Sequence, residues 1–238
     1  SLQPFIEKDL RERPDDPTTL RKEQFYASCW DEGCYNGDLY AMPSDTDNRA
    51  LYYNLDLFDK HAAELIAAGC VDPGDPSKPG PPRNWEQLRK CAEILTERDA
   101  AGNLTRVGFI PNYGNSWLYL YAWLNGGNFV SADGTRCTMN SPEVVEALTY
   151  VTELYDSMGG AEKVRAFESA MLGTGLDPFL FGKVAMKVDC DWFVESIANL
   201  KRDTRFGVTL APAPAGKPPV GWGAGWAYVI PAGAAHPD

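Results

Sequence analysis

The sequence predicts an α/β protein, in which strands and helices alternate along the chain and pack in layers. Short segments rich in β-favouring residues, such as residues 50–54 and 183–188, are separated by segments with helical periodicity, such as residues 144–155. The 238 residues are 44% hydrophobic and 23% charged, an ordinary composition for one large globular core or two modest ones.

The first predicted elements are short. Residues 1–34 are polar with helical character, which Pro14 and Pro17 interrupt. Residues 37–43 predict a turn and a short strand that ends at a proline. Residues 50–54 predict a second strand, because aromatic side chains favour the pleated conformation.

An amphipathic helix is expected over residues 55–69, with Gly69 as its terminator. The proline-rich residues 71–83 predict an irregular surface loop. Asn84 and Gln87 have the spacing of a capping box, which predicts a helix that runs to about residue 98.

The second half of the chain continues the alternation. Ser141 and Pro142 mark a helix start, because serine caps orphan amide groups and proline suits the first helical position. Asp133-Gly134 indicates the turn of a hairpin over residues 129–139. The other expected elements are helices over 116–124, 162–172 and 192–201, and strands over 106–111, 183–188, 206–210 and 226–230.

The charge of the chain excludes some function classes. A net charge of -11 and a pI of about 4.7 disfavour nucleic-acid binding, which needs clustered basic residues. The same charge repels anionic ligands and anionic membrane surfaces over long range. No apolar run approaches the roughly 20 residues of a membrane span, and no charged-then-apolar leader opens the sequence.

No motif for catalysis, metal binding or a cofactor is found. The six cysteines form no Cys-x-x-Cys pair, and both disulfides and buried free thiols fit their number. Two acidic pairs, Asp45 with Asp47 and Asp189 with Asp191, have the composition of a metal pair or a glycosidase dyad. Neither pair has an ionisable base beside it, so solvated loop acids are the simpler interpretation.

Aromatic residues give the stronger signal. The chain has seven tryptophans and eleven tyrosines, with a cluster at residues 117–123 and a glycine-rich pair at Trp222 and Trp226. The apolar face of a pyranose ring stacks on indole, while its hydroxyl groups pair with carboxylates and amides. Tryptophan beside Asp or Asn therefore suits a sugar site, although core packing is the more frequent reason for any single tryptophan.

The order of several motifs carries a family resemblance. A short strand ending in proline at residues 37–43 is followed by a Leu-Tyr-Tyr-Asn run at residues 51–54 and Trp-Glu-Gln-Leu at residues 85–88. Further motifs follow in the same order at residues 124–127, 141–143, 181–186, 207–214 and 228–237. Together they resemble the family 1 extracellular solute-binding proteins, which are maltose-binding-protein-like components of ABC transporters. The proline-rich loop is longer than is typical of that family.

The resemblance implies a type II periplasmic-binding-protein fold, with two α/β lobes joined by hinge strands and a ligand cleft between them. It also implies a chain truncated at both ends, mostly the second lobe with parts of the first. Residues 1–43 are then a remnant of the first lobe with the first hinge strand, and residues 44–214 the second lobe. Residues 215–238 are then the return hinge strand and a further remnant.

The resemblance also implies ligand-binding residues. Trp192 matches a stacking aromatic that follows a strand, Trp117 lies near a second stacking position with Asn115 beside it, and Asp47 matches an acid that binds sugar hydroxyls. The full predicted set is Asp45, Asp47, Asn115, Trp117, Asp191, Trp192, Trp222, Gly223 and Trp226.

The implied function is binding and not catalysis. We expect a monomer that binds a neutral mono- or oligosaccharide and delivers it to ABC permease subunits of the inner membrane. The expected location is periplasmic or extracellular, with a lipid anchor as an option, and no cofactor or metal is expected. The alternatives are a glycoside hydrolase, a solute-binding protein for a cation such as a polyamine, and a receptor lobe without a transport role.

Overall fold

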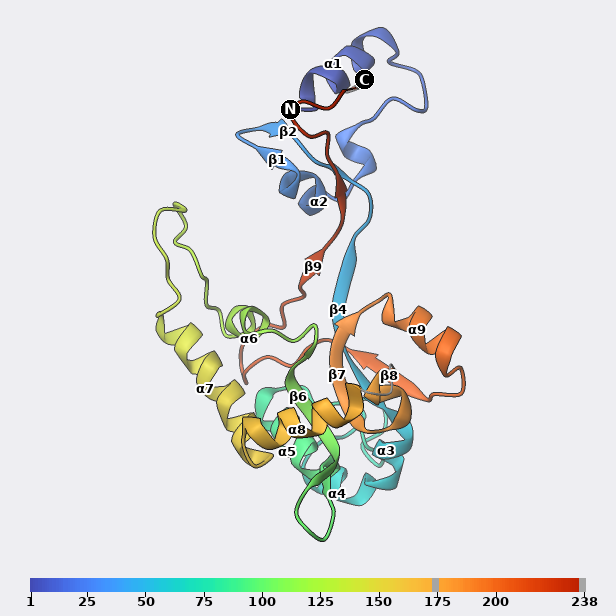
Figure 1. The fold of residues 1–238 in the computed structure, drawn as a ribbon, viewed down its shortest axis with the longest axis vertical. Coiled ribbons are helices and arrows are strands. Elements are labelled where there is room, and N and C mark those ends of the chain that lie inside the picture. The colour runs from blue at the N-terminus through green and yellow to red at the C-terminus, as the bar shows by residue number, and fades with distance from the viewer. Residues whose placement is uncertain (173–175, 236–238) are drawn as a thin grey trace. The chain divides into compact units, whose positions relative to one another are not determined.

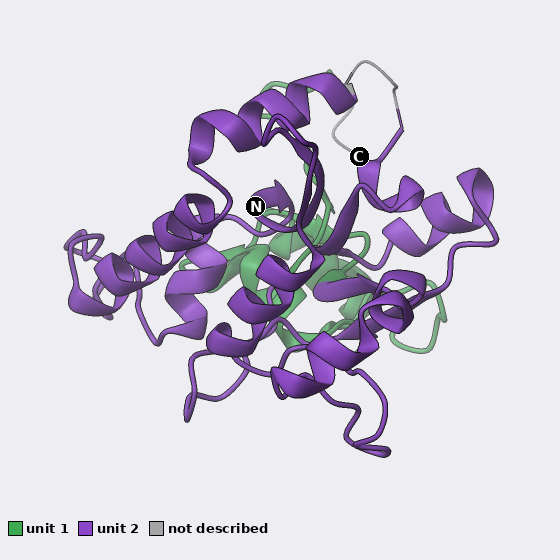
Figure 2. Ribbon diagram, turned by 90° about the horizontal axis from the view of Figure 1, so that it is seen from below, with its two compact units in different colours: residues 1–48, 223–238 green, residues 49–222 purple. Residues whose placement is uncertain are grey.

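The computed structural model describes residues 1–172 and 176–235 (Figure 1). The chain divides into two compact units, coloured separately in Figure 2. Unit 1 comprises Ser1–Asn48 and Gly223–Asp238, and unit 2 comprises Arg49–Trp222. The end of the last predicted motif, at residues 236–237, lies outside the described residues.

Unit 1 consists of short elements around a small core. Ile6, Trp30 and Leu39 form the buried centre of this core. Strands β1 and β2 form one antiparallel pair, β3 and β10 form another, and β9 pairs with the start of β4. The bounds are α1 Gln3–Glu12, η1 Lys22–Gln24, α2 Ala27–Glu32, β1 Cys34–Tyr35, β2 Asp38–Leu39, β3 Met42–Pro43, β9 Gly223–Ala224 and β10 Ala227–Tyr228.

Unit 2 contains a mixed sheet with the strand order β5-β6-β7-β4-β8. The central pair β6–β7 is parallel, and the other pairs are antiparallel. All seven residues of β7 are buried, as expected for an inner strand that is covered on both faces. The strand bounds are β4 Asp47–Asn54, β5 Glu97–Arg98, β6 Leu104–Gly114, β7 Val184–Cys190 and β8 Phe206–Thr209.

Helices cover this sheet in separate hydrophobic clusters. The largest cluster joins α3 to α7 with residues of β4, β6 and β7. A second cluster packs α8 against β6 and β7, and a third packs α9 and η2 against β4. The bounds are α3 Leu55–Lys60, α4 Ala62–Ala67, α5 Trp85–Leu95, α6 Leu118–Leu124, α7 Pro142–Ser157, α8 Ala161–Leu172, η2 Pro178–Phe181 and α9 Phe193–Leu200. No helix within the described ranges is long and apolar enough to cross a membrane.

The α/β class predicted from the alternation is confirmed, and several element boundaries differ. The helix expected over residues 55–69 is interrupted at His61, which closes α3 and opens α4 with φ -108° and ψ 26°. Gly69, with φ +81°, ends α4 as predicted. Its N–H donates to Ile66 O at 2.9 Å and that of Cys70 donates to Leu65 O at 2.9 Å, which is a Schellman motif.

Helix α5 is shorter than predicted because the residues that follow Leu95 join the sheet. α5 ends at Leu95, and the hydroxyl of Thr96 donates to Ala92 O at 2.6 Å and accepts from Gly108 N–H at 3.0 Å. Residues 97–98 then form β5 beside β6. Asn84 caps the helix as predicted, whereas the side chain of Gln87 accepts from Arg83 N–H, so a reciprocal capping box is not formed.

Two predicted strand regions are largely irregular. Residues 129–139 form a single bridge between Val130 and Cys137 in place of a hairpin with two strands. Val130 and Met139 are about half exposed, so this segment has no buried face to stabilise longer strands. The strand expected over 226–230 is limited to Ala227–Tyr228.

The helix predicted to start at Ser141 forms, but without the expected serine cap. Pro142 occupies the first position of α7, but the side chain of Ser141 makes no capping hydrogen bond.

The loop over residues 71–83 is irregular, as predicted, and its two ends are tied together. Gly80 N–H donates to Cys70 O at 2.9 Å, and Asp72 N–H donates to Lys78 O at 3.0 Å. The guanidinium of Arg83 donates to Val71 O at 3.1 Å. The residues at the tip, 76–78, are exposed.

Candidate functional site

Three aromatic side chains gather around the indole of Trp222 in unit 2. Tyr119 and Trp123 lie on one face of α6, since residues four apart on a helix are neighbours, and Trp117 is the N-cap residue of that helix. The ring centroid of Trp222 lies 4.6 Å from that of Tyr119, 5.5 Å from that of Trp117 and 6.3 Å from that of Trp123. We call these four residues the Trp222 cluster.

A cation covers one face of this cluster. The guanidinium carbon of Arg49 lies 3.9 Å from the ring centroid of Trp222, within the range of cation–π attraction. The backbone N–H of Arg49 also donates to Trp222 O at 3.1 Å, which fixes the two residues side by side. This contact joins two residues that lie 173 positions apart in the sequence, so local sequence patterns do not reveal it.

The cluster combines anchoring with exposure. Trp222 packs partly against the main hydrophobic core of unit 2, whereas the side chain of Trp117 is 43% exposed. An indole that is held by neighbouring rings and still open to solvent offers an apolar face with few conformations to lose on binding. The Trp222 cluster is therefore suited to stacking against a flat apolar ligand surface.

Trp192 is a second exposed indole of unit 2. It is the N-cap residue of α9, separated from the end of β7 by Asp191, and is 52% exposed. Its ring packs edge-on against Phe193, with the centroids 6.4 Å apart. The carboxylate of Asp191 accepts the N–H of Trp192 at 3.0 Å, so this predicted site residue also shapes the turn that presents the indole.

Asn115 lies at the end of β6 and is engaged with β7. Its side-chain amide donates to Asp189 at 2.7 Å, and its backbone N–H donates to Val188 O at 2.8 Å. Asn115 precedes Trp117 by two residues, as predicted. Its side chain, however, holds the ends of β6 and β7 together.

A buried lysine next to this bond was not predicted as a functional residue. The ammonium of Lys187 lies 2.5 Å from carboxylate oxygens of both Asp177 and Asp189, and its side chain is 2% exposed. It also lies 4.0 Å from the ring centroid of Phe193. A lysine inside the otherwise apolar run of residues 184–188 is the sequence signal that could have identified it, because buried charges need partners.

The predicted site residues of unit 1 surround its return strand. The carboxylate of Asp47 accepts from Ala224 N–H at 3.1 Å, and that of Asp45 accepts from Trp226 N–H at 2.8 Å. Gly223 pairs with Asn48 in the β4–β9 ladder, and Trp226 is 77% exposed. One oxygen of each acid is thus used to hold backbone, a role that the sequence did not predict.

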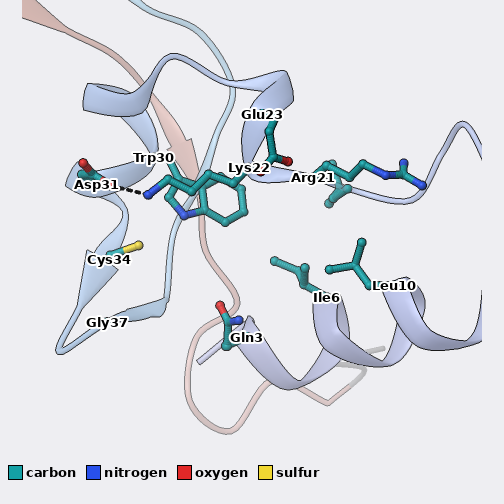
Figure 3. A pocket seen from close by; sticks show the side chains of 11 residues that line it. Gln3, Ile6, Leu10, Arg21, Lys22, Glu23, Trp30, Asp31, Cys34 and Gly37 are labelled. Carbon is teal, nitrogen blue, oxygen red and sulfur yellow. Dashed lines mark hydrogen bonds and ion pairs between the residues drawn. The ribbon is translucent and has the colours of Figure 1, made fainter. Parts of the chain in front are cut away.

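Unit 1 also contains two hollows. One, of about 500 Å³, is lined by apolar residues including Ile6, Leu10 and Trp30, and by a Lys22–Asp31 ion pair at 3.0 Å (Figure 3). The second, of about 540 Å³, includes Asp45 among its lining residues. The first hollow therefore combines apolar side chains with charged groups of both signs, since Arg21 and Glu23 line it as well as Lys22 and Asp31.

The acidic pairs do not have the setting of a catalytic dyad or a metal site. Asp189 is buried and paired with Lys187, and Asp45 and Asp47 bind backbone amides. Within residues 1–172 and 176–235, no group of three potential metal ligands is found. Burial raises the pKa of Glu168, which lines a separate cavity of unit 2 that also includes Asp177.

Comparison with known proteins gives consistent matches. A family model described as bacterial extracellular solute-binding protein matches residues 1–238. A probable ABC transporter-binding protein from Deinococcus radiodurans is 28% identical over 124 residues, which cover 50% of this chain and 26% of the relative. A putative binding protein from Brucella abortus is 24% identical over 194 residues, covering 81% of this chain and 42% of the relative. The chain therefore spans less than half the length of these curated relatives.

Solved structures show the same fold. CpMnBP1 with mannobiose bound aligns with a TM-score of 0.76 and 25% identity, covering 96% of this chain and 54% of that one. An ABC substrate-binding protein from Listeria monocytogenes in complex with cycloalternan aligns with a TM-score of 0.61 and 26% identity, covering 91% and 48%. The predicted periplasmic-binding fold is confirmed, and the chain belongs to the bacterial extracellular solute-binding protein family.

Proposed function

We propose that this chain is part of the substrate-binding component of an ABC importer, and that it binds a neutral saccharide through exposed indoles. The observation that carries the proposal is the Trp222 cluster, in which Trp117 is 43% exposed while the rings of Tyr119 and Trp222 pack against it. Trp192, at 52% exposure, provides a second stacking surface on the same unit.

The chemistry of the cluster favours a sugar. The C–H face of a pyranose stacks on indole, and its hydroxyl groups accept hydrogen bonds from a guanidinium such as that of Arg49. The net charge of -11 opposes an anionic ligand. CpMnBP1, which shares the fold over most of this chain, was solved with mannobiose and with mannotriose, which supports short saccharides as the first ligands to test.

The remaining parts of the proposal follow from the family. We assign unit 2, Arg49–Trp222, to the second lobe and unit 1 to parts of the first lobe. The segments expected from the sequence, residues 1–43, 44–214 and 215–238, differ from this division by several residues at each boundary. Membership of an extracellular family supports a periplasmic or extracellular location. A lipid anchor, a monomeric state and permease subunits as partners extend the same proposal.

The roles of individual site residues are also proposals. Trp192 and Trp117 are assigned to stacking, while Asn115, Asp191 and Trp222 support the surfaces that present them. Asp45, Asp47, Gly223 and Trp226 are assigned to the ligand through their place in the family motifs.

Calorimetry on the full-length protein tests the proposal. Mannobiose, mannotriose and maltose are titrated first, with spermidine as the cationic rival. We expect saturable binding of at least one saccharide, and a loss of roughly 2–4 kcal/mol of binding free energy in Trp192→Ala, as for central aromatic hot spots. Phe181→Ala is the matched control, because Phe181 is a similarly exposed aromatic of unit 2 at 49%.

The outcomes separate the candidate ligands. Binding of spermidine alone, weakened by salt, would assign the indoles to cation–π recognition instead. Equal losses in Trp192→Ala and Phe181→Ala would remove Trp192 from the site. Release of monosaccharide from a test glycoside would point to a hydrolase.

A further inference from the structure

Two of the six cysteines of the chain are close together in the core of unit 2. The sulfur atoms of Cys70 and Cys91 are 2.6 Å apart. Both side chains are 0% exposed and belong to the main hydrophobic cluster of unit 2. A covalent S–S bond measures about 2.0 Å, and no other cysteine pair within the described residues is shown at such a separation.

Rigid local structure holds each cysteine in place. Cys70 follows the Schellman motif at Gly69, and its N–H donates to Leu65 O at 2.9 Å. Cys91 lies in the middle of α5, and Gln87, one helical turn earlier, donates to Gly69 O at 2.9 Å. The end of α4 and the side of α5 are therefore fixed against each other by contacts that do not involve the sulfur atoms.

Other roles for the pair are less well supported. A metal site needs further ligands, and no group of three His, Cys, Asp or Glu side chains is assembled in the described parts of the chain. Two free thiols would be simple apolar fillers, but that role does not require the sulfur atoms to approach to 2.6 Å. Membership of an extracellular family supports an oxidising environment.

We propose that Cys70 and Cys91 form a disulfide bond in the exported protein. The thiolate of one cysteine, written here for Cys70, attacks an external disulfide, such as that of a thiol–disulfide oxidoreductase, and releases one thiolate of the oxidant. The thiolate of Cys91 then attacks the Cys70 sulfur of the mixed disulfide and releases the second thiolate. The two cysteines lose two protons and two electrons, and the external disulfide is reduced to two thiols.

The surroundings of the two thiols differ in the folded chain. The hydrogen bond from Cys91 lowers the pKa of Cys70. The same hydrogen bond, together with burial, raises the pKa of Cys91. These shifts belong to the folded chain, in which both sulfur atoms are buried. The exchange with an external disulfide therefore takes place before α4 and α5 have docked, when either thiolate can attack first.

The bond would restrain the proline-rich loop between the two helices. The bond joins two residues that lie 21 positions apart in the sequence. Such a cross-link restricts the conformations of the unfolded chain more than those of the folded chain. We expect the melting temperature to fall by about 5–10 °C when the bond is absent. This inference does not depend on the ligand proposed above.

Peptide mapping tests the proposal directly. The exported protein is unfolded with N-ethylmaleimide and without reductant, and is then digested with trypsin. Cleavage after Lys60, Arg83, Lys90 and Arg98 places Cys70 and Cys91 in two different peptides, residues 61–83 and 91–98. We expect these peptides to appear joined, with the summed mass less two hydrogen atoms, and to separate on reduction.

Control variants complete the experiment. Cys137→Ser, at an exposed cysteine, should leave the joined peptide unchanged. Cys70→Ser should remove it and leave Cys91 alkylated; mapping is done on unfolded chains, so loss of stability in this variant does not affect the result. Alkylation of both cysteines in the wild-type protein, or a bond from either one to a different cysteine, would overturn the proposal.

Discussion

Unit 2 contains two assemblies of tryptophan and tyrosine side chains, one buried in the core and one partly exposed to solvent. In the buried one, Trp85 and Tyr150 stack with centroids 4.1 Å apart and an angle of 9°, and Tyr121 packs beside them. The hydroxyl of Tyr150 donates to Trp85 O at 2.9 Å, and that of Tyr121 donates to Pro111 O at 3.0 Å. In the Trp222 cluster, by contrast, Trp117 remains 43% exposed.

The difference shows how one short helix serves both core and surface. Tyr119, Tyr121 and Trp123 alternate along α6, yet only Tyr121 is buried, at 3% exposure. Helical periodicity separates Tyr121 from the other two, which are four residues apart and share a face. Aromatic content alone therefore does not identify a binding surface. The useful distinction is how much of the ring remains exposed in the folded protein.

The sharpest test of this distinction is Trp85→Ala. Removal of a buried indole leaves a cavity, and we expect a loss of about 3–5 kcal/mol in the free energy of unfolding. The affinity of the remaining folded protein for its ligand should not change. Chemical denaturation and calorimetry measure the two quantities separately, and a large fall in affinity at equal folded concentration would break the comparison.

The complementary variant is Trp117→Ala. We expect a loss of roughly 2–4 kcal/mol in the binding free energy of the saccharide. The free energy of unfolding should change by less than about 1 kcal/mol, because much of the indole is already in water. If Trp117→Ala melts early and binds with wild-type affinity, the Trp222 cluster is a core and not a site.

A pair of tyrosine variants sharpens the comparison without creating large cavities. Tyr150→Phe removes a buried hydroxyl and leaves Trp85 O without that donor, which should cost about 1–3 kcal/mol of stability. Tyr119→Phe, on the more exposed face of the same unit, should change stability by less than about 0.5 kcal/mol. Equal effects of the two substitutions, measured by urea denaturation, would contradict the assignment of buried and surface roles.

The smallest expected effect is a dependence on alkaline pH. Burial raises the pKa of Tyr121 and of Tyr150 above the ordinary value of 10.0. A group with a raised folded-state pKa contributes stability that is complete below its unfolded pKa and is lost as pH rises beyond it. We therefore expect the free energy of unfolding to fall above about pH 10.

The loss should be shallower in Tyr150→Phe, measured by urea midpoints between about pH 8 and pH 11. Tyr26→Phe is the control, since Tyr26 is 74% exposed. A slope in Tyr150→Phe as steep as in the wild-type protein would remove Tyr150 from the linkage.

Much of the fold could be predicted from local sequence, and the misses have physical causes. The Gly69 terminator, the Asn84 cap and the proline-rich loop are local signals, and each was correct. The end of α5 was not, because the hydroxyl of Thr96 binds β6, a contact that depends on the sheet. The interruption at His61 has no comparable signal in the neighbouring residues.

The candidate site was less accessible to sequence reasoning. The cluster at residues 117–123 could be recognised from composition, but Trp222 joins it from about 100 residues away. The cation–π contact of Arg49 likewise depends on the approach of these distant segments. For Lys187, the charge in a buried strand was visible, but its two acidic partners are defined only by the folded sheet.

The tied ends of the loop over residues 71–83 have a consequence for protein engineering. Because Cys70 and Gly80 are joined by a backbone hydrogen bond at 2.9 Å, the base of the loop is closed independently of its exposed tip. A fluorescent reporter domain inserted between Pro76 and Ser77 would start and finish at nearly the same point, so the helices on either side need not move apart. The loop is thus a natural position for attaching a reporter domain without disturbing the helices on either side.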